Sequence, residues 1–269
     1  MKPLYIYFLA ASLACTSCSD SWLDLNPSTS VPTDQAFSSL EDAQSALNGI
    51  YRLASAHSYY GDNFFYFGDC RAADVQARMT KGDGRRVSPY YEYNVKATDS
   101  FNSSLPWNQV YKVIRQTNNL IAATESGLIK TTDEAALNEI KAQALAMRGL
   151  ALYDLIRVFA MPYSYDNGQS LGVPIVTTAT DQSSKPARNT VAECYDQIIT
   201  DLTGSLAGLS KEKKDGCLNY WAVQGILSRV YLNKLDYPNA YKAATDVIEN
   251  SKSLYQLYTR DEYPTVWGK

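Results

Sequence analysis

The sequence predicts a mostly α-helical protein in which helices pair into repeated hairpins joined by long irregular loops. Apolar residues recur at helical spacing through most of the chain after residue 37, and capping residues stand at several helix starts. No strand-rich block is long enough to form a major sheet. The 269 residues are sufficient for one good core or two modest ones.

The first predicted helix covers residues 38–56. Ser38 and Glu41 stand at capping-box spacing, in which the two residues hydrogen-bond each other's backbone N–H groups. Apolar residues then recur along one face of the helix. They are Leu40, Ala43, Leu47, Ile50 and Tyr51. Residues 57–104 show no long period, and their aromatics, glycines and polar clusters favour loops with room for a short hairpin.

Two longer helices follow. The first covers about 106–126, where Trp107 begins an apolar stripe and is assigned to the core. The second begins with a capping box at Thr131 and Glu134, and its apolar pattern continues until Pro162. Both helices are long enough to contribute a continuous face to a core.

A second irregular stretch covers residues 162–188 and contains PYSYDNG and the extended-looking LGVPIV. Thr190 and Glu193 then form the capping box of a fourth helix, which runs to about Leu206. The irregular stretch therefore connects two predicted helices without a predicted element of its own.

The last two predicted helices lie at about 219–250, with a break at Asp236-Tyr237-Pro238. Gly225 lies among large apolar residues on the first helix, and alanines recur on the second. Small side chains let two antiparallel helices approach closely, and such a pair buries its apolar face by stacking on neighbours. The pair resembles a tetratricopeptide repeat.

The third and fourth predicted helices resemble a degenerate version of the same pair. Ala142, Ala146 and Gly149 are the small residues on the longer helix. Arg148 and Tyr153 lie on this helix as well, and we expect them to contact neighbouring helices rather than a ligand. The predicted fold is therefore a set of tetratricopeptide-like helical repeats with long irregular loops.

Charge and cysteine usage exclude several classes of function. A net charge of −3 and an isoelectric point near 5.3 argue against binding to nucleic acid. Beyond the N-terminal region the cysteines are Cys70, Cys194 and Cys217, an odd number whose wide spacing does not fit a zinc site. We expect them to be small buried apolar residues, with one disulfide at most. The sequence predicts no metal and no cofactor.

An enzyme is not predicted. The single histidine, His57, stands next to no recognisable serine or cysteine nucleophile motif. Asp69 and Asp74 are a conceivable carboxylate pair, but their spacing within a loop does not indicate a glycosidase. The KGDGRR segment at 81–86 is a charged turn and not a nucleotide-binding loop.

The N-terminus predicts export. MKPLYIYFLAASLA carries Lys2 before an apolar run that is too short to span a bilayer and has the length and flanks of a signal peptide. Cys15 and Cys18 stand where a signal peptide would be cleaved, which resembles the lipobox of a bacterial lipoprotein. A plain cleaved signal peptide with two incidental cysteines is the alternative. Acyl chains on a cysteine would anchor the chain to a membrane.

Six blocks of this sequence resemble the SusD/RagB family of outer-membrane lipoproteins. Their order and spacing are similar to those of the family, and they cover nearly the whole mature chain. They are CSDSWLDLNP (18–27), FSSLEDAQSALNGIY (37–51), WNQVYKVIRQTNN (107–119), ALAMRGLALYDLIRVFAMPY (144–163), LGVPIV (171–176) and RNTVAECYDQIITDL (188–202).

The resemblance implies a division of the chain. It favours Cys18 over Cys15 as the acylated residue, with a signal peptide at 1–17 and a lipid-anchored tether at 18–37. Residues 38–269 would form the helical N-terminal domain of the family. Family members are about twice as long, so we expect the C-terminal part to be absent from this chain.

The resemblance also implies a function. Such proteins face the cell exterior on the outer membrane, bind oligosaccharides or polysaccharides, and deliver them to a SusC-like TonB-dependent transporter; some members bind peptides instead. Their fold packs tetratricopeptide-like units against a more irregular, ligand-facing part. The alternatives are a helical-repeat scaffold that binds the transporter without a ligand site of its own, and a peptide-binding member.

Candidate ligand-binding residues lie in two aromatic patches, YYGDNFFYF (59–67) and PYYEYN (89–94). Aromatic planes stack on the apolar faces of sugar rings, and Asp69 and Arg71 lie close in sequence as polar partners. The resemblance adds Asp74, Arg78 and Asn102, whose counterparts in the family face glycan. The predicted site residues are Tyr59, Tyr60, Asp74, Arg78, Tyr90, Tyr91 and Asn102. In the competing interpretation the tyrosines pack beneath long loops with their hydroxyls in water.

Overall fold

The computed structural model describes residues 37–72, 75, 88–94, 106–178, 184–251 and 254–266. Within them the protein is mostly helical, which confirms the predicted fold class. The longer helices are α2 (Leu40–Ala54), α6 (Trp107–Glu125), α7 (Glu134–Phe159), α8 (Val191–Ser205), α9 (Tyr220–Asn233) and α10 (Tyr237–Asn250). Short elements are η2 (His57–Gly61), α3 (Asn63–Arg71), α4 (Ser88–Tyr91), η3 (Tyr163–Tyr165), η4 (Leu206–Gly208) and α11 (Tyr263–Val266).

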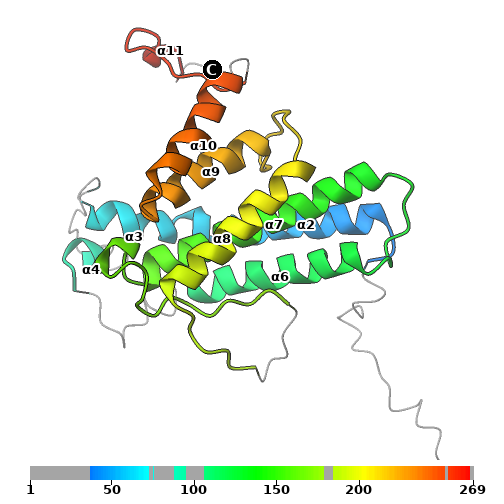
Figure 1. Ribbon diagram of the computed structural model, residues 1–269, viewed down its shortest axis with the longest axis horizontal. Coiled ribbons are helices and arrows are strands. Elements are labelled where there is room, and N and C mark those ends of the chain that lie inside the picture. The colour runs from blue at the N-terminus through cyan, green and yellow to red at the C-terminus, as the bar shows by residue number, and fades with distance from the viewer. Residues whose placement is uncertain are drawn as a thin grey trace, which may run out of the picture.

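Helices α2, α6, α7 and α8 lie side by side, with α7 packed against all three of the others (Figure 1). The α9–α10 pair stacks beyond α8, and α3 and α4 lie together at one end of the bundle. Among the described residues, strand pairing is limited to isolated bridges, Ser39 with Lys130 and Leu171 with Thr190. The core is therefore formed between helices.

The capping box of α2 stands one residue later than predicted. Ser39 Oγ accepts from the Asp42 backbone N–H at 3.2 Å, and Asp42 Oδ2 accepts from the Ser39 N–H at 3.0 Å. The Ser38 hydroxyl donates to the same carboxylate oxygen at 2.8 Å. The predicted box of Ser38 and Glu41 is therefore wrong, because the N-cap of α2 is Ser39 and the residue three positions later is Asp42.

Helix α7 also begins later than predicted. Asp133 caps it, its Oδ1 accepting from the Ala136 N–H at 2.9 Å, whereas Thr131 Oγ1 accepts from the Asp133 N–H in the turn before the helix. The helix ends at Phe159, before Pro162, as predicted.

The fourth predicted helix is confirmed as α8. Its capping box pairs Thr190 with Glu193 at 3.2 Å and 2.8 Å for the two backbone N–H bonds. The stretch before it, 162–188, is irregular as expected in its described part, apart from the single turn η3.

The loops predicted at 57–104 are wrong for the first part of that range. Residues 57–71 form the π-helical turn η2 and the helix α3. Only Phe64 and Cys70 of α3 are buried, so this short helix carries too little apolar periodicity to predict. Contacts with other elements hold it in place instead.

The core prediction is largely confirmed. Cys70 and Cys194 are buried free thiols, and Cys217 is a half-buried one. Trp107 is half-buried and packs against the core through Tyr111 and Phe159, with ring centroids 4.9 Å apart in both pairs. The largest fully buried apolar side chains are Tyr59, Tyr153, Leu47, Ile50, Leu120, Leu155, Ile198, Leu202, Leu227, Val110, Val113 and Val173.

A buried ion pair joins α7 to α8. Arg148 donates from Nε and Nη2 to the two oxygens of Asp201, at 2.8 Å and 2.6 Å. Its Nη1 donates to Asn118 Oδ1 of α6 at 3.0 Å and to the Thr177 carbonyl at 3.1 Å. Asn118 in turn donates to the Val176 carbonyl. One guanidinium therefore connects three helices and the extended segment 173–178, which confirms that Arg148 makes inter-helix contacts.

The second expected inter-helix residue, Tyr153, reaches from α7 to α9. Its hydroxyl donates to the Arg229 carbonyl at 3.3 Å and accepts from Asn233 Nδ2 at 2.5 Å. These bonds connect the main bundle to the α9–α10 pair.

Close approach between helices depends on Gly149 and not on Gly225. A Cβ added at Gly149 would lie 2.9 Å from Leu202 Cγ and 3.2 Å from Asp201 Cβ. A Cβ added at Gly225 would meet nothing within 4 Å. The α7–α8 crossing therefore requires its glycine, whereas the expected role of Gly225 at the α9–α10 crossing is wrong. Buried Ala240 and Ala243 stand at that crossing on α10.

Replacing Arg148 with Met should lower the free energy of unfolding by about 3–5 kcal/mol, because Asp201 is left as a buried, uncompensated charge. Urea unfolding followed by circular dichroism measures the loss. The matched double variant Arg148→Met with Asp201→Leu should recover part of it, since no charge remains buried. A double variant no more stable than Arg148→Met would show that the contacts to Asn118 and Thr177 matter more than the ion pair.

Alanine should have opposite effects at the two glycines. Gly225→Ala should stabilise the protein by about 0.5–1 kcal/mol, because helix propensity improves in open space. Gly149→Ala should destabilise it by about 1–3 kcal/mol, because α8 must move away from the new methyl group. Thermal unfolding of both variants provides the measurement, and equal shifts would contradict the assignment of the crossing.

Candidate ligand-binding surface

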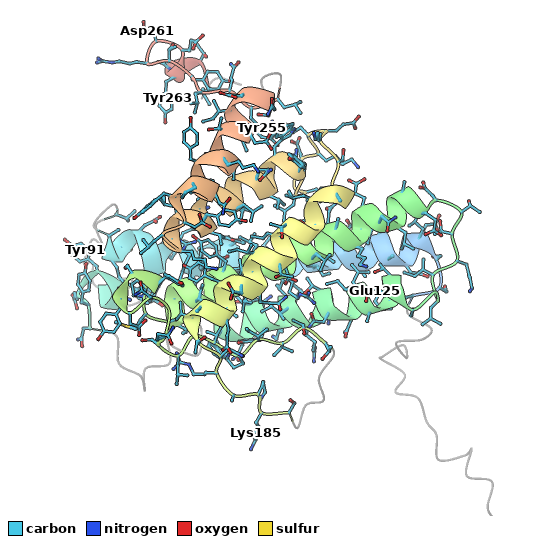
Figure 2. The ribbon with its side chains drawn as sticks, in the orientation of Figure 1. Tyr91, Glu125, Lys185, Tyr255, Asp261 and Tyr263 are labelled. Atoms are coloured by element: carbon cyan, nitrogen blue, oxygen red, sulfur yellow. The ribbon has the colours of Figure 1, made fainter. Side chains whose placement is uncertain are left out.

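Aromatic side chains gather where η2, α3 and α4 meet at one end of the bundle. Figure 2 shows Tyr91 at this end, away from Tyr255 and Tyr263 near the C-terminal helices. The rings differ widely in exposure. Tyr59, Phe64 and Tyr90 are buried; Tyr60, Phe67 and Tyr91 are half-buried; Phe65, Tyr66 and Tyr93 are exposed at 47%, 37% and 67%.

The buried part of this cluster is centred on Asp154 of α7. Its Oδ2 accepts hydrogen bonds from the hydroxyls of Tyr59 at 2.6 Å and Tyr60 at 2.5 Å. The two tyrosine rings stack with centroids 4.2 Å apart. Burial, with the nearby carboxylate, raises the pKa of both hydroxyls above the ordinary value of 10.0, so both remain protonated donors. Asp154 thereby attaches η2 to the core.

Burial also raises the pKa of the Asp154 carboxyl from its ordinary value of 3.8. The two tyrosine hydrogen bonds, Arg157 and Arg229 act in the opposite direction. Arg157 Nη1 lies 3.3 Å from Asp154 Oδ1, and the guanidinium also lies over the rings of Phe64 and Tyr153 at 5.6 Å and 5.2 Å.

The exposed rings of the cluster are Phe65 and Tyr66 of α3 and Tyr93, which follows α4. Arg71, at the end of α3, lies beside Tyr93. The Arg71 guanidinium lies 4.8 Å from the Phe67 ring centroid and 5.8 Å from that of Tyr93. The Tyr93 hydroxyl donates to the Arg71 backbone carbonyl. Tyr93 has a φ of 55°, a left-handed conformation that is uncommon for a bulky residue. Its contacts with Arg71 hold a large exposed ring in this conformation. We call Phe65, Tyr66, Arg71 and Tyr93 the aromatic surface.

The structure separates the predicted site residues. Tyr59 is 0% exposed and Tyr90 is 2% exposed, so neither ring has a face that a ligand could stack on. Apolar packing places both tyrosines in the core, and Tyr59 also donates a hydrogen bond to Asp154. This burial argues against the ligand contacts predicted for them. Tyr60 and Tyr91 are half-buried.

Three other predicted site residues fall outside the part of the chain that the structure describes. Asp74, Arg78 and Asn102 lie outside the described residues, as do Cys15 and Cys18. Asp69 and Arg71, expected as polar partners, are both exposed on α3. Only Arg71 of these two joins the aromatic surface through a ring contact.

The predicted patches contain both buried and exposed rings. Phe65, Tyr66 and Tyr93 belong to the quoted patches, but only the fold shows that they are exposed. Once 63–71 is known to be helical, its buried residues Phe64 and Cys70 and the half-buried Phe67 fall at spacings of three residues. The residues between them then face outward.

The aromatic surface carries groups that suit contact with a ring-shaped ligand. Exposed rings, a guanidinium and the Asp69 carboxylate can contact an apolar ring face and its hydroxyl groups. The described residues hold no cluster of three or more His, Cys and carboxylate side chains that could bind a metal ion. Within the same residues, no helix is both long and apolar enough to cross a membrane.

These features define a helical bundle with exposed aromatic rings at one end. Residues 21–232 match the SusD-like family, which is described as "Starch-binding associating with outer membrane". The chain belongs to the SusD-like family, which confirms the resemblance seen in the sequence.

Three relatives illustrate the match. A crystal structure of a SusD superfamily protein from Bacteroides thetaiotaomicron is 63% identical, with a TM-score of 0.81 over 86% of this chain and 50% of that one. A SusD-like protein from Bacteroides ovatus is 26% identical over 93% of this chain and 45% of its own length. A laminarin-binding SusD-like protein shares the fold at 19% identity and a TM-score of 0.69, over 87% of this chain and 50% of that one. The chain thus spans about half the length of these relatives.

The Asp154 cluster makes a pH-dependent contribution to stability. Because the folded pKa of Asp154 lies above 3.8, this contribution is complete below about pH 3.8 and is lost as pH rises through the folded pKa. Asp154→Asn keeps an oxygen acceptor for the tyrosines and does not titrate. The unfolding free energy of the original protein should therefore fall relative to that of the variant as pH rises. Urea unfolding of both proteins at successive pH values checks this, and a difference that is independent of pH would contradict it.

Proposed function

We propose that this chain is the helical part of a cell-surface lipoprotein that binds oligosaccharides or polysaccharides and delivers them to a SusC-like TonB-dependent transporter. The observation that carries the proposal is the aromatic surface, found on a chain whose family is described as starch-binding and associating with the outer membrane. The laminarin-binding relative with the same fold supports a carbohydrate ligand.

The proposal assigns a role to the N-terminal residues as well. Residues 1–17 would be a signal peptide, 18–37 a tether acylated at Cys18, and 38–269 the family's N-terminal helical domain. This tether would hold the aromatic surface outside the outer membrane, within reach of the transporter. The transporter partner rests on the resemblance to SusD/RagB proteins. The proposal is of a binding protein and not an enzyme, in agreement with the family description.

A second function is favoured by a separate observation. Tyr59 and Tyr90 are buried, and α9 and α10 present exposed apolar side chains. They include Leu232, Leu235, Tyr237, Tyr241 and Ile248. Buried tyrosines and a wide apolar helix pair suit a scaffold that binds the transporter without contacting nutrient. A peptide ligand is a further alternative within the family.

The double variant Tyr66→Ala with Tyr93→Ala tests the carbohydrate proposal. In affinity gel electrophoresis with the full chain, starch or laminarin in the gel should retard the original protein. The double variant should bind that polysaccharide about tenfold more weakly or worse, because stacked aromatic side chains dominate such contacts. Circular dichroism confirms that each protein is folded.

Tyr241→Ala is the matched control. Tyr241 is 74% exposed, compared with 67% for Tyr93, but it lies on α10 and not on the aromatic surface. Its loss should leave retardation unchanged. A folded chain that no gel retards would overturn the carbohydrate proposal and favour the scaffold. Equal weakening by Tyr241→Ala and the double variant would refute the assignment of the aromatic surface.

A further inference from the structure

A small hollow lies where the C-terminal ends of α7 and α9 meet the N-terminal end of α8. It has a volume of 310 Å³, at the low end of the ~300–1,000 Å³ range of ligand pockets. Its lining includes Arg157 from α7, Ser164 from the following loop, Tyr195 from α8 and Asn233 from α9. We call it the Arg157 hollow. In Figure 1 these helix ends lie on the side of the bundle that carries α3.

Arg157 is the only charged residue among those that line the hollow. Its side chain is 36% exposed, and Asp154, its acidic partner, is 1% exposed and lies behind it at 3.3 Å. A guanidinium presents five N–H donors in a planar fork. Among the described residues, Asp154 accepts the one hydrogen bond that Arg157 makes with a side chain or carbonyl. The guanidinium of Arg157 therefore has N–H donors beyond the one that Asp154 uses, and it forms part of the lining of the hollow.

The charged groups around the Arg157 hollow favour an anion. Asp154 contacts Arg157 at 3.3 Å, and the charge of Arg229 also acts to lower the pKa of Asp154. The other ion pair near the hollow, Lys234 with Asp196 at 2.6 Å, is internally neutral. Because the partly exposed Arg157 is the charged residue of the lining, the hollow favours an anionic group.

The rim supplies apolar contact. Met161, Leu232 and Leu235 line the hollow and are 45%, 52% and 40% exposed. A guanidinium and exposed apolar side chains in one lining suit a ring that carries one oxyanion. Arg157 also lies over the Phe64 ring beneath the aromatic surface, so the hollow and that surface belong to one end of the molecule.

We propose that the Arg157 hollow is an anion-binding subsite that receives the carboxylate or sulfate group of an acidic saccharide. The inference deepens the proposed function, on which it rests for the choice of a saccharide. Arg157 holds the oxyanion through two parallel hydrogen bonds, and Met161 and Leu232 contact the apolar face of the same sugar residue.

The methionine methyl groups of the full chain provide a local test by ¹³C NMR. Met161 stands at the rim of the hollow, whereas Met147 is 3% exposed in the core and serves as an internal control. Trigalacturonate should shift the Met161 signal saturably and leave Met147 unchanged. Its methyl ester, which has no charge, should not shift Met161. A sulfated trisaccharide in a third titration distinguishes sulfate from carboxylate as the preferred group.

Variants separate a specific site from general charge attraction. Arg157→Gln should weaken the binding of the preferred acidic probe about tenfold or more, because a charge-assisted pair is lost. Arg52→Gln removes one exposed positive charge outside the hollow and should change that affinity by roughly twofold at most. Equal effects of the two variants would overturn the proposal, as would the absence of any Met161 shift with both acidic probes.

A rim substitution keeps the proposal testable if Arg157→Gln does not fold. Leu232 is 52% exposed, so a polar residue there leaves the core intact. Leu232→Glu should abolish the acid-dependent Met161 shift by repulsion, while Leu232→Gln should retain it; equal shifts in the two would refute the site. The aromatic-surface variants could lose polysaccharide binding while no acidic probe shifts the Met161 methyl signal. That result would leave the proposed function standing and refute the subsite. A Met161 shift without retardation by any polysaccharide gel would support the subsite and refute the proposed polysaccharide binding.

Discussion

Helix α7 imposes the constraint on which the rest of the structure depends, because it carries charged side chains into the core. A buried charge is costly unless it is paired and hydrogen-bonded. Arg148 meets this requirement through Asp201 of α8, Asn118 of α6 and the Thr177 carbonyl. The same pairing fixes how α6, α8 and one extended segment lie around α7.

Asp154, further along α7 towards its C-terminal end, meets the same requirement with different partners. Two tyrosine hydroxyls and Arg157 surround its carboxylate. These bonds attach η2 to the core, and η2 leads directly into α3, which presents Phe65 and Tyr66 to solvent. The burial of Tyr59 and the exposure of the aromatic surface are therefore two consequences of one arrangement. Arg157 belongs to both the buried cluster and the proposed subsite.

The α9–α10 pair shows how the repeat principle works in this chain. Tyr153 connects α9 to the bundle, and Ala240 and Ala243 let α10 lie close to α9. Glycine is required at the α7–α8 crossing instead, where Leu202 lies against Gly149. Helix pairs with similar sequence patterns therefore pack through different small residues. For this reason the sequence pattern wrongly predicts a helix-crossing contact at Gly225.

The sequence alone determined the helical class, the family, the capping of α8 and the end of α7 before Pro162, because these depend on local periodicity, on residue types and on motif order. It also identified Arg148 and Tyr153 as inter-helix residues. Tertiary structure decided which tyrosine rings are buried, because exposure around η2 and α3 follows from Asp154, which lies 95 residues beyond Tyr59 in the chain. Tertiary structure also determined where the Arg157 hollow lies, because the ends of α7, α8 and α9 meet there only after folding. Neither the Tyr59–Asp154 hydrogen bond nor the meeting of the helix ends can be predicted from local residue spacing. Long-range contacts therefore determine which side chains this surface exposes.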